Sequence, residues 1–115
     1  MRPIRDYHLL SIPDLEDELS VVADLLYRSI EMLGRVKTTH HCDNLLYYYQ
    51  SSGESHAAKQ READYNTQNQ LSDVIEFEQQ VAAYRLSYET LVSFISWRRS
   101  AFDGEASSRL QSSLT

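Results

Sequence analysis

Apolar side chains recur at helical spacing over the first half of the chain. They follow one another at steps of three or four residues, or of seven where Ser29 interrupts the pattern, at Leu15, Leu19, Val22, Leu26, Leu33 and Val36. Such steps place side chains on one face of a helix. Asp14 and the acids after it favour a start there, because negative charge stabilises the positive end of a helix. The pattern predicts a helix over 14–51, and Gly34 is expected either to bend it or to admit another backbone.

A second and stronger pattern follows Ser51-Ser52-Gly53, which predicts a reversal of the chain. Neither Gly nor Pro occurs between residues 55 and 102, so the sequence predicts one long helix over this range. Its apolar positions alternate steps of three and four, as in a coiled-coil seam. This seam consists of Val74, Phe77, Val81, Tyr84, Tyr88, Leu91, Ile95, Arg98 and Phe102. We expect the seam to be buried against the first helix and against further copies of the chain.

The two ends of the chain lack such patterns. Pro3 and Pro13 oppose helix formation over residues 1–13, which we expect to be an extended arm that docks through its apolar side chains. Residues 103–115 are mostly small and polar and are expected to form a short last helix or a frayed tail. The predicted fold is all-α: a single domain over 1–115 with two long antiparallel helices, forming a helical hairpin or bundle that assembles into an oligomer.

Composition and charge restrict the binding partners and the cellular location that we expect for the protein. The formal net charge of -6 argues against attraction of the whole molecule to nucleic acid, so any such binding must be local. No apolar run approaches the roughly 18 residues that a membrane span needs. Cys42 is the only cysteine, which excludes an internal disulfide. We therefore expect a cytoplasmic protein without a membrane partner.

Candidate catalytic and metal sites are weak. His40, His41, Cys42 and Asp43 are all residue types that bind zinc. Neighbours on a helix diverge by about 100°, however, so adjacent residues do not reach one ion and a polar helix segment is the simpler interpretation. The chain also lacks the glycine-rich turns that hold phosphates or build an oxyanion pocket beside a nucleophile. We expect no catalytic residue, no metal and no cofactor.

Basic and aromatic residues are interleaved in several short stretches. Single-stranded nucleic acid requires this combination, because cations bind its phosphates and flat rings stack on its bases. The candidate residues are Arg28, Arg35, Lys37, Tyr47, Tyr48, Tyr49, Lys59, Arg61, Arg98 and Arg99. The alternative is that they are ordinary surface charges and interface tyrosines. Oligomerisation would favour the first interpretation, because it repeats each small patch.

Three segments resemble the UvsY-type recombination mediators of tailed phages, which are small helical proteins that form rings. The segments are Leu10-Ser11-Ile12-Pro13-Asp14-Leu15, Leu46-Tyr47-Tyr48-Tyr49-Gln50-Ser51-Ser52-Gly53 and Arg98-Arg99-Ser100-Ala101-Phe102. The resemblance implies a recombination mediator in the host cytoplasm. Such a protein binds single-stranded DNA, contacts a recombinase and a single-strand binding protein, and hydrolyses nothing. This chain departs from the family in its acidity and in lacking an insertion between the helices.

Two functions are therefore expected. The first is a non-enzymatic accessory protein of DNA recombination or replication, acting as an oligomer on single-stranded DNA. The alternative is a helical protein-interaction module, such as a phage-encoded inhibitor or adaptor of a host protein, which needs only the seam and an exposed patch. A third hypothesis, an oligomer that sequesters a small molecule, has no residue that identifies its ligand.

Overall fold

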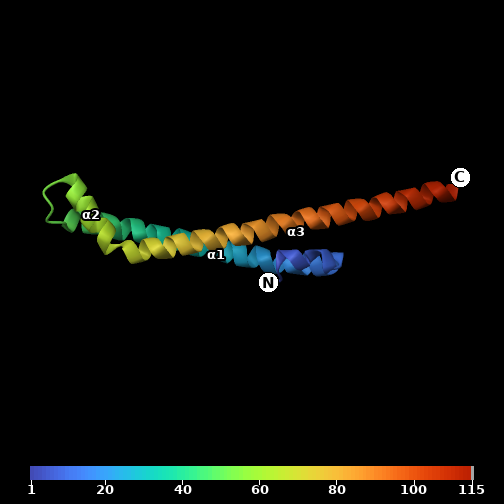
Figure 1. Ribbon diagram of the computed structural model, residues 1–115, viewed down its shortest axis with the longest axis horizontal. Coiled ribbons are helices and arrows are strands. Elements are labelled where there is room, and N and C mark those ends of the chain that lie inside the picture. The colour runs from blue at the N-terminus through green and yellow to red at the C-terminus, as the bar shows by residue number, and fades with distance from the viewer. Residues whose placement is uncertain (115) are drawn as a thin grey trace. The chain divides into compact units, whose positions relative to one another are not determined.

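The protein is all-α in a computed structural model that describes the backbone of residues 1–114 and the side chains of residues 1–101. A short 3-10 helix, η1 (Ile4–Leu9), precedes the long helix α1 (Ile12–Gln50). The short helix α2 (His56–Asn66) and the long helix α3 (Gln68–Leu114) follow (Figure 1). No strand occurs in residues 1–114, and the predicted fold class is confirmed.

The contacts divide the chain into two compact units. The terminal unit comprises Met1–Leu26 and Tyr84–Thr115, and the central unit comprises Tyr27–Ala83. Each unit pairs a stretch of α1 with a stretch of α3. In the central unit, Lys37 lies opposite Glu78 and Asp43 lies opposite Gln70. The residue number rises on one helix as it falls on the other, so the two stretches are antiparallel.

α1 begins two residues before the predicted start at Asp14. The Ser11 hydroxyl accepts a hydrogen bond from the Asp14 amide at 3.3 Å, and the Ser11 carbonyl accepts one from the Leu15 amide. Ser11 therefore caps the helix. Pro13 is tolerated in the first turn because the amide that it lacks has no partner within a helix at that position. The helix then continues through Gly34 to Gln50.

The prediction of an extended arm over residues 1–13 is wrong in part, because Ile4–Leu9 form the helix η1. Pro3 is itself extended, with φ of -62° and ψ of 145°, and the 3-10 turns begin after it. The turns bring Tyr7 and Leu10 into the core of the terminal unit, where Tyr7 is completely buried. The remaining members of this core are Leu15, Val22, Leu91 and Ile95, and the partly buried Leu19 packs against them.

The predicted helix over 55–102 is interrupted at Thr67, which ends α2 and has φ of -112° and ψ of 11°. Its amide and its hydroxyl both donate to the Ala63 carbonyl, at 3.1 and 2.9 Å. A threonine hydroxyl that bonds back to the preceding turn competes with regular helix geometry. Thr67 is neither Gly nor Pro, so the absence of those two residues from 55–102 did not indicate this break.

The predicted reversal at Ser51-Ser52-Gly53 is present between α1 and α2. A Cβ atom placed on Gly53 would lie 3.1 Å from the Ala58 Cβ atom and 3.1 Å from the Lys59 amide nitrogen. This approach explains why the turn contains glycine. Ser55 then caps α2, since its hydroxyl accepts from the Ala58 amide at 3.1 Å.

Of the eight seam residues whose side chains are described, seven are buried or partly buried, and Tyr88 is exposed in the single chain. Val74, Val81, Leu91 and Ile95 are buried, and Phe77, Tyr84 and Arg98 are partly buried. Tyr88 is 36% exposed, whereas its neighbour Ser87 is 3% exposed. Phe102 lies outside the described side chains.

The burial of Ser87, where burial of Tyr88 was expected, has a steric explanation. The Tyr7 ring of η1 is buried beside Ser87 in the terminal unit. A small residue leaves room for that ring, and a second tyrosine in its place would not.

Candidate interaction surfaces

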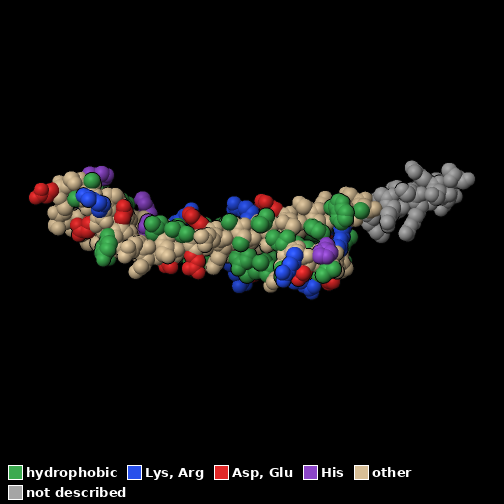
Figure 2. Space-filling model, in the orientation of Figure 1, with side chains coloured by type: hydrophobic (Ala, Val, Ile, Leu, Met, Phe, Trp, Pro, Cys, Tyr) green, Lys and Arg blue, Asp and Glu red, His purple; other side chains and the backbone are tan. Residues whose placement is uncertain are grey.

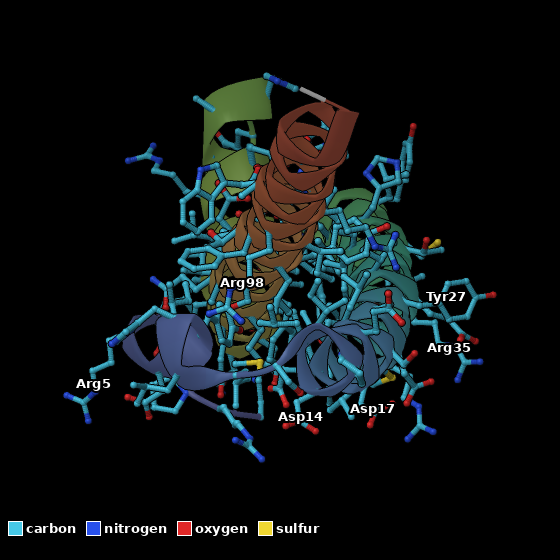
Figure 3. The ribbon with its side chains drawn as sticks, turned by 90° about the vertical axis from the view of Figure 1, so that its right-hand side faces the viewer. Arg5, Asp14, Asp17, Tyr27, Arg35 and Arg98 are labelled. Carbon is cyan, nitrogen blue, oxygen red and sulfur yellow. The ribbon has the colours of Figure 1, made fainter. Side chains whose placement is uncertain are left out.

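Two of the predicted DNA-binding cations contact other segments of the terminal unit. The Arg98 guanidinium donates hydrogen bonds to the carbonyls of His8 and Leu10 at the end of η1, and Figure 3 shows it reaching toward that helix. Arg99 forms an ion pair with Glu16 of α1. Helix ends leave carbonyls without partners, so Arg98 acts as a cap for η1.

Burial in the core of the terminal unit also changes the pKa of one side chain. Burial raises the pKa of the Tyr7 hydroxyl, the neighbouring Ser87 hydroxyl partly offsets this, and the Glu18 carboxylate adds to the rise. The Tyr7 hydroxyl therefore stays protonated to a higher pH than a tyrosine in solution.

The predicted cations of the central unit also have contacts within the chain. Arg35 pairs with Glu31 at 2.6 Å, and Lys37 pairs with Glu78 at 3.3 Å. The Arg61 Nε atom donates to the Ala57 carbonyl at 3.4 Å, and the Lys59 ammonium lies 5.8 Å from the centroid of the Tyr48 ring. Arg28 interacts with its surroundings as well. Exposed pairs of this kind contribute little to stability, so a ligand can replace them at low cost.

The three consecutive tyrosines do not form one stacking platform. The Tyr48 hydroxyl hydrogen-bonds to the Nδ1 atom of His56 at 2.6 Å and ties the end of α1 to the start of α2. The rings of Tyr48 and Tyr49 meet edge to face, with centroids 5.4 Å apart. Tyr49 is 78% exposed and Tyr47 is 39% exposed. Because neighbours on a helix diverge by about 100°, each ring faces a different direction.

A hydrogen-bonded network connects α1 to α2 and to Thr67, which lies between α2 and α3. The Asn44 amide group donates to an Asp64 oxygen and to the Thr67 hydroxyl, both at 3.0 Å, and accepts from Gln60 at 3.0 Å. Gln60 also donates to Asp64 at 2.9 Å. These bonds to the carboxylate, first from Gln60 and then from Asn44, lower the pKa of Asp64.

Sequence reasoning missed this network, although a signal for it exists. Stepping backward from Val74 by the three-four spacing of the seam reaches Gln70, Thr67, Ala63 and Gln60. Gln70 and Gln60 are partly buried, and Thr67 and Ala63 are buried. The seam therefore continues upstream with polar and small residues, which an apolar pattern search passes over.

The exposed side of α1 in the central unit carries large apolar side chains. Tyr27 and Tyr49 are 70% and 78% exposed, and Ile30 and Leu45 are 44% and 43% exposed. At about 100° per residue these four positions share one side of the helix with Gly34, Thr38 and His41. We call this surface the outer face of α1. Figure 3 shows Tyr27 and the adjacent Arg35 projecting away from α3.

The terminal unit carries a smaller aromatic surface on α3. Trp97 is 65% exposed, and its ring meets that of Phe94 edge to face with centroids 6.3 Å apart. Together with Ser93 they line a shallow hollow of about 340 Å³.

Charges of both signs are interspersed on the face of the molecule shown in Figure 2. Among the described residues, no group of three or more His, Cys, Asp or Glu side chains is arranged to hold a metal ion. His41 and Cys42 are exposed, and His40 is partly buried. Within the same residues, no helix is both long enough and apolar enough to cross a membrane.

Comparison with protein-family models, with curated proteins and with solved structures found no match for this chain.

Proposed function

We propose that the protein is a non-enzymatic helical interaction module that binds a protein partner through the outer face of α1. The observation that carries this proposal is the exposure of Tyr27, Ile30, Leu45 and Tyr49 on one side of a helix. The helix pairing within the chain uses the opposite side of α1, where Ser29 is buried and Leu33 and Val36 are partly buried. The fold therefore does not need apolar side chains on the outer face.

The chemistry of the outer face suits a protein interface. Tyrosine is enriched where partners meet, because it combines a large apolar ring with a polar tip. Aromatic side chains near the centre of an interface carry a large share of binding energy. The outer face places such rings near both ends of a helical stretch that runs from Tyr27 to Tyr49, a length of about 33 Å at 1.5 Å per residue.

Site-specific photocrosslinking tests the proposal in cells that express the full chain. A benzophenone side chain replaces Tyr27 in one variant, Tyr49 in a second and Gln79, which is exposed on α3, in a matched control. We expect discrete protein adducts from positions 27 and 49 and weaker or different ones from position 79. Equal adduct patterns at all three positions would show that the outer face has no special partner.

Binding of single-stranded DNA is a second candidate, supported by one specific observation. Two exposed rings, Tyr27 and Tyr49, share α1 with Arg35, whose pair with Glu31 is a surface contact. A phosphate can replace that carboxylate while bases stack on the tyrosines. A recombination-accessory function, with a recombinase and a single-strand binding protein as further partners, would depend on this surface.

Fluorescence anisotropy with a labelled oligonucleotide separates the two candidates. If DNA is the ligand, binding at low salt weakens as salt rises and is reduced by Arg35→Ala and by Tyr27→Ala. Gln79→Ala is the control. Absent binding, or binding indifferent to salt, would eliminate the DNA candidate and leave the protein-interaction proposal intact.

A further inference from the structure

We infer that the partner seated on the outer face of α1 is a second copy of this chain, whose α1 crosses antiparallel at Gly34. This inference rests on the proposed function, because it names the occupant of the same surface.

The fold of a single chain does not require a glycine at position 34. A glycine inside a helix costs about 1 kcal/mol relative to alanine. A Cβ atom on Gly34 would have nothing within 4 Å, and the residue does not have a positive φ. Neither internal packing nor backbone conformation explains the residue. Close approach by a backbone from outside does explain it, since only glycine leaves that space free.

The side chains about Gly34 are spaced equally before and after it. Ile30 and Thr38 lie four residues before and after it, and Tyr27 and His41 lie seven before and after it. A two-fold axis through an antiparallel crossing presents the same patch from both copies. Tyr27 of each copy then faces His41 of the other, and two pairs of rings flank the glycine contact.

Charge also favours a second copy as the partner. Glu31 and Arg35 lie along one edge of the outer face and are paired at 2.6 Å within the chain. In an antiparallel pair the same edge of both copies meets. Glu31 of one copy then lies within one helical turn of Arg35 of the other along the crossing. The edge is therefore complementary to itself, as an interface between identical chains requires.

The decisive variant is Gly34→Ala, because the inference predicts opposite effects on folding and on association. Alanine meets open space within one chain, so the variant is expected to unfold at higher temperature than the wild type at low protein concentration. At the crossing the added methyl group separates the two backbones. We expect the dimer dissociation constant, measured by sedimentation equilibrium, to rise at least about tenfold. Gln79→Ala on α3 serves as the control and is expected to leave association unchanged.

A charge exchange between copies supplies an independent test. Glu31→Arg and Arg35→Glu are each expected to weaken self-association, because each variant places like charges along the shared edge. Mixing the two variant proteins is expected to restore association, as a heterodimer. The mixture does not restore the pair within either chain, so recovery reports a contact between copies.

The outcomes distinguish the inference from the proposed function. A wild-type chain that stays monomeric up to millimolar concentration, or Gly34→Ala that associates as tightly as the wild type, would overturn the second copy as partner. Photocrosslinks from Tyr27 to a different protein would still uphold the interaction module in that case. Failure of both experiments would remove the outer face as a protein-binding surface.

Discussion

The two units of the molecule are made from the same pair of helices, yet their interiors differ in chemistry. The terminal unit buries large apolar side chains, among which Tyr7, Leu15 and Leu91 are completely covered. The central unit buries smaller side chains: Ala63 and Thr67 almost completely, and Val74, Val81 and Ser29 nearly so. A buried leucine contributes about 1.5–3 kcal/mol, whereas one hydrogen bond contributes about 1 kcal/mol net. We conclude that apolar burial stabilises the terminal unit, while a polar network determines how the helices of the central unit fit together.

The largest expected effect comes from truncating a buried side chain in the core of the terminal unit. Leu91→Ala is expected to lower the free energy of unfolding by about 2–5 kcal/mol, because it removes buried methyl groups and leaves a cavity. Leu86→Ala on the same helix is the control, since Leu86 is 58% exposed and its loss is expected to cost under about 0.5 kcal/mol. Urea denaturation followed by circular dichroism measures both. Similar losses for the two variants would contradict the comparison.

An intermediate effect is expected from the centre of the polar network. Asn44→Ala removes three hydrogen bonds and is expected to destabilise the central unit by about 1–3 kcal/mol. Hydrogen exchange measured by mass spectrometry should show faster exchange in α2 and unchanged exchange in η1. Asn69→Ala, at an exposed position of α3, is the control. Equal acceleration in η1 would mean that the two units do not respond separately.

The smallest effect concerns the acid dependence of the central unit. The pKa of Asp64 is held below its ordinary value of 3.8, chiefly by the bond from Gln60. A carboxyl group with a lowered pKa contributes stability above its unfolded pKa and loses that contribution as the pH falls through its folded pKa. Asp64→Asn cannot titrate and should therefore lose less stability than the wild type when the pH is lowered below 3.8. Parallel thermal unfolding curves across that range would show that Asp64 plays no such part.

Periodicity was sufficient for the parts of the fold that follow from apolar spacing. It predicted the helix that contains Leu15 and Val36, and it predicted a seam whose members Val74, Val81, Leu91 and Ile95 are buried. The turn at Gly53 was also predictable, because glycine is the residue that a close approach of backbone requires.

Features that depend on contacts distant in sequence were not predictable from spacing. Tyr88 has the right spacing for burial, but Tyr7 comes from the other end of the chain and fits over Ser87 instead. Arg98 was predicted both as a seam residue and as a nucleic-acid contact. The spacing did not indicate that its guanidinium caps η1, and its contact with nucleic acid stays a prediction. A cation at a seam position could have indicated an internal role, because a charge there needs partners within the fold.

The exposure of Trp97 determines what optical spectroscopy can detect in this protein. It is the only tryptophan of the chain, and it lies mostly in solvent while the core side chains around Leu91 are covered. Its emission is therefore expected to resemble that of a free indole in water even in the folded protein, and to change little on denaturation. The same residue is for that reason a sensitive natural label for any molecule that settles on α3 beside Phe94 and excludes water from the ring.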